Sequence, residues 1–150
     1  NILRQLAVFY PDEIVSVTLD NGDKYEGLLG SLYPEENTSQ NAALLVLHSC
    51  CGNQTEVFPI CHITSVSILS GSTYNDEITY LSAPVPYPSG CSADCQRAIR
   101  EYFPVGTSYA ATQGGQGTVI RNEFGMLVLA GCVNNSLTFI STCKESAYSI

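Results

Sequence analysis

The sequence has 150 residues, which is enough for one ordinary domain or two very small ones. It is 45% hydrophobic, and its six Lys and Arg residues against fourteen Asp and Glu residues give a net charge of −8. Nucleic acids and anionic membranes attract basic surfaces, and a membrane span needs roughly 18 consecutive apolar residues, so we expect neither kind of partner.

A short helix is predicted first, over residues 2–10. Its apolar side chains Ile2, Leu3, Leu6 and Phe9 recur at the spacing of one helical face. Pro11 then ends the helical pattern.

A bent hairpin follows over residues 14–30. Val15, Val17 and Leu19 alternate with polar residues, which is typical of a strand with one buried face. Asn21-Gly22 predicts a tight type I′ turn, because both central residues of that turn need positive φ. Gly27 lies within the return strand, where a glycine often marks a bend. We interpret this hairpin as the starting piece of a small closed barrel.

The rest of the first half predicts three more strands. They cover residues 42–49, 56–60 and 62–69, with Pro59 near the second join. Residues 1–70 are therefore expected to form one small five-stranded domain preceded by a helix.

Residues 71–90 are expected to be a linker. Pro84, Pro86 and Pro88 stand at alternate positions, a stiff and extended pattern. Residues 78–81 favour an extra strand within this segment.

The second half, residues 91–150, repeats the order of the first in shorter form. It predicts a helix over residues 93–102 with Ser92 as its N-cap. Predicted strands then cover residues 105–112, 117–121, 126–130 and 137–142. We therefore expect a second small barrel, joined to the first by the proline-rich linker.

Seven cysteines, an odd number, are the candidate disulfide residues: Cys50, Cys51, Cys61, Cys91, Cys95, Cys132 and Cys143. At least one thiol cannot pair within the chain, so it is either free or bonded to a neighbouring subunit. The side chains of Cys50 and Cys51 should diverge on an extended chain and serve different partners. Spacing alone does not fix the pairing of the others.

We expect neither a metal site nor a catalytic one. Cys50, Cys51, Cys61 and His62 are residue types that bind zinc, but the sequence lacks the paired Cys-x-x-Cys knuckles of a structural site. It also lacks the sequence motifs of serine hydrolases, zinc proteases and phosphate-binding loops. No cofactor and no enzymatic activity are expected.

Two stretches resemble the Sm-like (LSm) family of small β-barrels. VSVTLDNGDKYEGLLGSL is similar to the first family motif, and LLVLHSCCGNQTEVFPICHITSVSIL is similar to the later strands. The resemblance covers residues 2–69 and, more weakly, 93–149. It implies a mostly β protein with two small five-stranded Sm/SH3-like barrels, each preceded by a short helix. It also implies assembly through strand edges.

The RNA site of that family does not carry over. Family members bind RNA partly through a loop with Arg-Gly or Lys-Gly, and the corresponding residues 49–53 here contain no cation. We therefore expect a structural protein that assembles with copies of itself into an extracellular or spore-surface filament or layer, stabilised by disulfides. Its composition is similar to that of cysteine-rich bacterial spore and surface proteins. The alternative is an intracellular Sm-like RNA-binding or adaptor ring.

Overall fold

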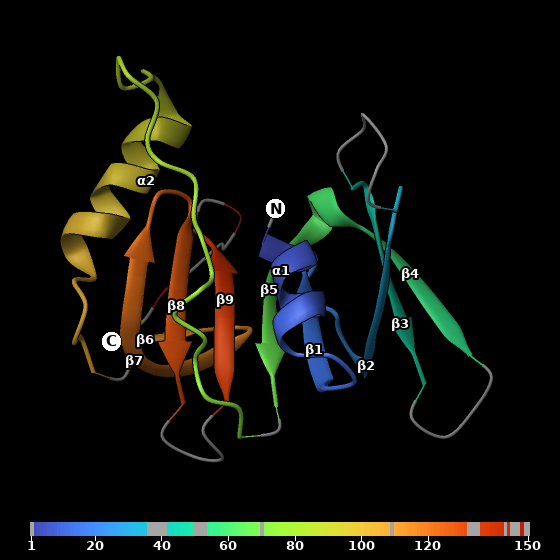
Figure 1. The fold of residues 1–150 in the computed structure, drawn as a ribbon. Coiled ribbons are helices and arrows are strands. Elements are labelled where there is room, and N and C mark those ends of the chain that lie inside the picture. The colour runs from blue at the N-terminus through green and yellow to red at the C-terminus, as the bar shows by residue number, and fades with distance from the viewer. Residues whose placement is uncertain are drawn as a thin grey trace.

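A computed structural model describes residues 2–35, 42–49, 54–69, 71–108, 110–131, 136–142, 144 and 148. These residues form a mostly β fold, which confirms the expected class. Nine antiparallel strands make one curled sheet in the order β4-β3-β2-β1-β5-β9-β8-β7-β6, and two α-helices accompany it (Figure 1).

The first half contains the expected helix and five strands. These elements are α1 (Ile2–Phe9), β1 (Ile14–Leu19), β2 (Lys24–Tyr33), β3 (Leu44–His48), β4 (Thr55–Pro59), the 3₁₀ turn η1 (Ile60–His62) and β5 (Ile63–Ile68). The hydrophobic periodicity predicted each strand to within a few residues.

The first hairpin has a different turn from the one expected. Gly22 has a φ of +89°, but Asn21 is not among the described residues with positive φ, so the turn is not type I′. The amide of Gly22 donates to the Leu19 carbonyl at 2.9 Å, and the Leu19 amide donates to the Asp23 carbonyl at 2.9 Å. This is a turn from Leu19 to Gly22 whose last residue alone adopts positive φ.

The second half departs further from the prediction. It contains α2 (Cys91–Tyr102), β6 (Ala110–Thr112), β7 (Gly115–Glu123), β8 (Met126–Ala130) and β9 (Leu137–Ser141). Ser92 is not the N-cap, because α2 starts at Cys91 and Gly90 holds the cap position. The strand expected over residues 105–112 shrinks to three residues, and the described part of this half has four strands. Residues 78–81 do not form a strand.

Strand β5 joins the two halves. It pairs with β1 on one side and with β9 on the other, through Ser65↔Ile140, Val66↔Phe139, Ser67↔Thr138 and Ile68↔Leu137. All six residues of β5 are buried. The two halves therefore share one sheet.

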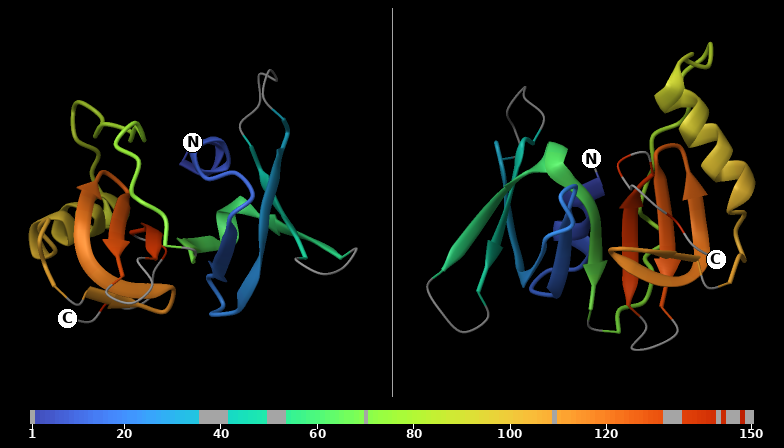
Figure 2. Two further views of the ribbon diagram at one scale, coloured as in Figure 1. Left: turned by 60° about the horizontal axis from the view of Figure 1, so that its bottom comes forward. Right: turned by 180° about the vertical axis from the view of Figure 1, so that it is seen from behind.

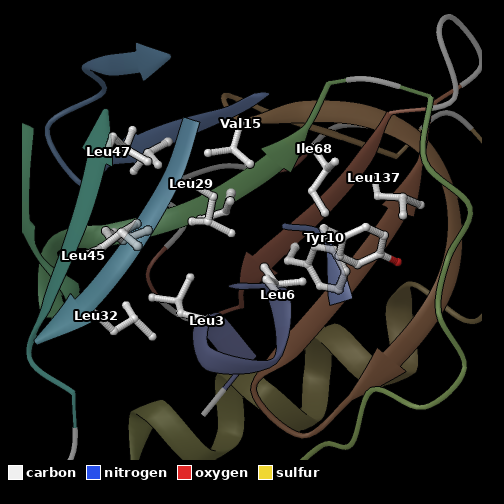
Figure 3. Close-up of a cluster of buried hydrophobic side chains, with 14 of the residues drawn as sticks. Leu3, Leu6, Tyr10, Val15, Leu29, Leu32, Leu45, Leu47, Ile68 and Leu137 are labelled. Atoms are coloured by element: carbon white, nitrogen blue, oxygen red, sulfur yellow. The ribbon is translucent and has the colours of Figure 1, made fainter. Parts of the chain in front are cut away.

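One face of this central region carries the main hydrophobic core (Figure 3). Leu3, Leu6 and Tyr10 from α1 and the residue after it lie over the sheet. The core also draws side chains from the second half, namely Val128, Leu137 and Phe139. A smaller cluster on the opposite face of the second half packs beneath α2, and it contains Ile99, Phe103, Ala110, Val119, Leu127, Leu129 and Ile140.

The opposite face of β1, β5 and β9 is lined by hydroxyl side chains. Its buried members are Ser16, Thr18, Ser65, Ser67 and Thr138. The β6–β7 hairpin lies over them, and β7 curls strongly to bring it there (Figure 2). The Ser67 hydroxyl lies 2.9 Å from the Gly114 carbonyl oxygen and 2.8 Å from the Thr138 hydroxyl oxygen.

Residues 73–80 form a segment that contacts both halves, and we refer to it as the strap. The Tyr10 hydroxyl donates to the Thr73 carbonyl at 2.9 Å, and the Tyr74 and Tyr80 hydroxyl oxygens are 2.6 Å apart. Arg121 of β7 donates to Asp76 at 2.9 Å and stacks 5.3 Å from the centre of the Tyr74 ring. The first part of the expected linker is therefore fixed to the sheet.

The close approach of the hairpin to Ser65 generates a stability prediction. A Cβ atom at Gly114 would overlap the Ser65 hydroxyl oxygen, and that buried oxygen has no hydrogen-bond partner among the described residues. Gly114→Ala should lower the free energy of unfolding by about 1–3 kcal/mol. Ser65→Ala alone should leave it unchanged or raise it by up to about 1 kcal/mol.

The double variant should recover part of the Gly114→Ala loss, because the overlapping oxygen is then absent. Urea denaturation of the four proteins measures this coupling. Strictly additive effects would show that the hairpin does not cover β5 in solution.

The strap generates a pH prediction. Burial raises the pKa of Tyr80 above its ordinary value, with the Tyr74 hydrogen bond as the next cause. The folded protein then holds this proton where the unfolded chain loses it, so stability should fall as pH rises through about 10 and beyond. Tyr80→Phe should reduce the loss seen by urea denaturation between about pH 9 and about pH 11. Tyr33→Phe, at a side chain that is 63% exposed, is the matched control and should leave the loss unchanged.

Candidate assembly surface

Three of the seven candidate disulfide residues can be placed in the structure. Cys61 is exposed in η1, Cys91 is exposed at the start of α2, and Cys95 is partly buried one helical turn later, and all three thiols are free. The other four cysteines, Cys50, Cys51, Cys132 and Cys143, lie outside the described residues. The disulfide pairing expected from the sequence stays a prediction.

The residues next to Cys61 make hydrogen bonds with other elements. Nδ1 of the neighbouring His62 lies 2.8 Å from a carboxylate oxygen of Asp20, and both side chains are about half exposed. Lys144 Nζ donates to the backbone carbonyl of Cys61 at 3.0 Å. Within the described ranges, no group of three or more His, Cys, Asp or Glu side chains converges as metal ligands would.

A small apolar hollow lies between α1, β5 and β9. Its volume is about 180 Å³. The lining residues are Ile2, Leu3, Leu6, Ile60, Ile63, Thr64, Ser65, Val66, Met126, Phe139, Ser141 and Lys144. Among the described residues that line it, Lys144 is the only charged one, and the hollow is smaller than the roughly 300–1,000 Å³ of typical ligand pockets.

The open edge of the sheet is a better candidate for a functional site than the hollow. Strand β4 is the first strand in the sheet order, and no described strand pairs with its outer side. Thr55, Glu56 and Val57 are exposed along it, whereas Phe58 points into the core. Such an edge presents unpaired backbone N–H and C=O groups to a neighbouring chain.

The other end of the sheet is covered by the chain itself. Strand β6 has only three residues. Beyond it, the Gly106 amide donates to the Val119 carbonyl at 2.8 Å, and the Val119 amide donates to the Thr107 carbonyl at 2.9 Å. Residues 106–107 thus occupy the edge of β7 next to β6, and β4 is the longest open edge in the described part of the chain.

The outer face of β3 and β4 has no Asp, Glu, Lys or Arg side chain. The register places Leu44, Val46 and His48 opposite Pro59, Val57 and Thr55, respectively. These six lie on one face because they alternate with Leu45, Leu47, Glu56 and Phe58, which lie on the other. The Val57 side chain is 52% exposed. We refer to the β4 edge together with this outer face as the β4 surface.

The β4 surface is not among the sites expected from the sequence. The sequence pattern that could have indicated it is the run Val57-Phe58-Pro59-Ile60, in which apolar residues occupy successive positions. In a strand this places apolar side chains on both faces, so one of them must meet something other than the core of its own half.

Helix α2 lies at the opposite end of the molecule from β4 (Figure 1). Tyr102 at its end is 69% exposed, and Val105 in the segment that follows it is 64% exposed. Neither helix in the described ranges has the length and apolar character needed to cross a membrane.

Comparison with models of protein families, with curated proteins and with solved structures finds no match to this chain. The arrangement of the described residues is therefore the basis for assigning a function.

The placement of the thiols predicts their reactivity. In the reduced, folded protein, Cys61 and Cys91 should react rapidly with a maleimide, and Cys95 should react more slowly because its side chain is partly buried. Peptide mass spectrometry after brief labelling measures each site, with urea-unfolded protein as the control in which the three rates converge. Protection of Cys91 in the folded monomer would contradict the placement of α2.

Proposed function

We propose that this chain is a structural subunit that assembles with copies of itself into an extracellular or spore-surface filament or layer. The observation that carries the proposal is the β4 surface, an open strand edge beside an outer face without charged side chains. Soluble monomers usually protect such edges with charges, short strands or covering loops. The β4 edge carries one exposed charged residue, Glu56, and one proline, Pro59, and no described strand covers it, so it is accessible for pairing with another chain.

We further propose that the two halves are two Sm-like modules in tandem. In each half a helix precedes the strands, and a glycine near the start of the second strand lies against the third. A Cβ atom at Gly27 would be 2.7 Å from the His48 carbonyl oxygen, and one at Gly117 would overlap the Ala130 carbonyl. Both second strands then shift register, between Leu29 and Leu32 and between Val119 and Arg121. These parallels support a repeated module.

The contact between the halves supports assembly by the same means. Strands β5 and β9 belong to different halves and pair through their edges over four residue pairs. Antiparallel pairing of this kind is a general mode of joining chains into one sheet. In this proposal, the contact between molecules is of the same type as the contact between halves.

Disulfides would lock the assembly. Cys91 is exposed at the start of α2, at the end of the molecule that does not carry β4. When thiols of two copies join, two electrons and two protons pass to an oxidant such as dioxygen, which favours a location outside the reducing cytosol. Contacts at both ends of one molecule can propagate into a filament.

Electron microscopy with and without reductant tests this function. We expect fibres or layers from the purified protein that fall apart when dithiothreitol is added. Cys91→Ser should shorten or abolish them if α2 supplies an inter-chain bond, whereas Val8→Ser, at an exposed position of α1, should leave them intact. A monodisperse monomer that does not respond to reductant would refute the proposal.

The alternative, an RNA-binding ring, makes the opposite prediction. Its cysteines would stay reduced, and the protein would bind single-stranded RNA with an affinity that falls with salt. The net charge of −8 argues against it.

A further inference from the structure

The hydrogen bonds of β4 determine which of its backbone groups are open. The Ser49 amide donates to the Gln54 carbonyl at 3.0 Å, and the Ile60 amide donates to the Ala43 carbonyl at 2.9 Å. In an antiparallel ladder, hydrogen-bonded pairs alternate with non-bonded pairs, so Glu56 and Phe58 bond to β3. The backbone groups of Thr55, Val57 and Pro59 therefore point away from β3.

These outward-pointing backbone groups include more acceptors than donors. Thr55 and Val57 each offer an N–H and a C=O group, whereas Pro59 offers only a C=O group because proline has no N–H. A second β4 strand, running antiparallel, can satisfy both donors in two registers that stay within the strand.

In the first register, Val57 lies opposite Val57 of the second copy. The two valines exchange a pair of hydrogen bonds, and each Thr55 amide donates to the Pro59 carbonyl of the other copy. In the second register, Thr55 lies opposite Val57 of the second copy. Each register provides four hydrogen bonds, so the backbone alone does not choose between them.

The side chains distinguish the two registers. In the second register, Glu56 lies directly opposite Glu56 of the other copy, and like charges at such positions repel. In the first register, Glu56 lies opposite Phe58 of the other copy, and the two Val57 side chains meet on the uncharged outer face. The first register therefore avoids a charge repulsion and adds an apolar contact.

We propose that two copies of this chain pair through β4, antiparallel, about a two-fold axis at Val57. The strand is complementary to itself in this register, and the pairing extends one sheet across both copies. A two-fold contact closes on itself, so it yields a dimer and leaves α2 at both outer ends. This inference rests on the self-association in the proposed function and specifies its contact at the β4 end.

The short length of the β4 edge, five residues, determines how strong the dimer is expected to be. Stable interfaces bury on the order of 1,200–2,000 Å², more than a single strand pair provides. We therefore expect a dimer in rapid exchange with monomer, which covalent bonds at other sites would make permanent.

Single cysteine substitutions test the register. With oxidised glutathione, which accepts the two electrons and becomes two thiols, Val57→Cys should form a bond between the two copies at position 57. Hydrogen-bonded antiparallel pairs place their Cα atoms about 5.5 Å apart, which suits a disulfide. Thr55→Cys alone should form no such bond between its own copies, and unsubstituted protein oxidised in parallel shows the bonds of the native cysteines. Peptide mass spectrometry identifies the bond at position 57.

Mixing Thr55→Cys with Val57→Cys distinguishes the registers. A bond between positions 55 and 57, with none between two residues at position 57, would overturn the proposed register. Dimers in which neither variant forms any bond at β4 would overturn the β4 contact and leave the self-assembly proposal standing. A monomer throughout would refute both.

Val57→Pro tests the strand pairing without new thiols. It removes an outward N–H group that β3 does not use, so the urea midpoint should change little. The dimer dissociation constant, from sedimentation equilibrium in reductant, should rise at least about tenfold. Val57→Thr keeps the N–H group and the branched shape, and it should change the constant by less than about threefold. Equal constants for Val57→Pro and the unsubstituted protein would overturn the inference.

Discussion

The ladder between β5 and β9 is the interaction on which the rest of the structure depends. It places Val66 opposite Phe139 and Ile68 opposite Leu137, so side chains from both halves enter one hydrophobic core. All six positions of β5 are buried, so the strand that joins the two halves is shielded from solvent on both of its faces. If β9 were withdrawn, β5 would lose a hydrogen-bonded neighbour and the core would lose Leu137 and Phe139. The halves are therefore energetically dependent on each other, although their strands follow similar orders.

That ladder also explains the unusual polarity of the central sheet. On one face Val15, Val17, Val66 and Ile68 pack beneath α1, and on the other Ser16, Thr18, Ser65 and Ser67 pack beneath the β6–β7 hairpin. Buried hydroxyl groups are stabilised where their oxygens find hydrogen-bond partners. Ser67 and Thr138 bond to each other and Ser67 also bonds to the Gly114 carbonyl, whereas the Ser65 oxygen has no partner among the described residues. The small Ser and Gly residues let the hairpin approach closely, which larger apolar side chains would prevent.

The local elements were predictable from the sequence because their causes are local. Alternation of apolar and polar residues located β1, and a run of apolar residues located β3 and β8 to within two residues. The type I′ turn expected at Asn21 was wrong. Asn-Gly is compatible both with that turn and with the observed turn from Leu19 to Gly22, and which of them forms depends on where the two strands stop pairing. Residues 105–108 alternate like a strand, yet they cap the edge of β7 because Val119 accepts and donates the bonds there. The pairing of β5 with β9 joins residues about seventy positions apart, and no spacing rule encodes it. The β4 surface was missed for the same reason, since the sheet order determines which strand is left at the edge.

The two ends of the sheet differ in a way that constrains any assembly. At one end, residues 106–107 cover the edge of β7, and the bonds that Val119 makes leave its backbone no capacity for a further strand. At the other end, β4 keeps two outward N–H groups, and Pro59 limits how far a partner strand can extend along it. Pairing through β4 alone cannot extend the sheet indefinitely, because a two-fold pair consumes the β4 edge of both copies. Extended growth therefore requires a second, chemically different contact, and the exposed thiol of Cys91 and the apolar side chains near the end of α2 lie at the end where that contact must form.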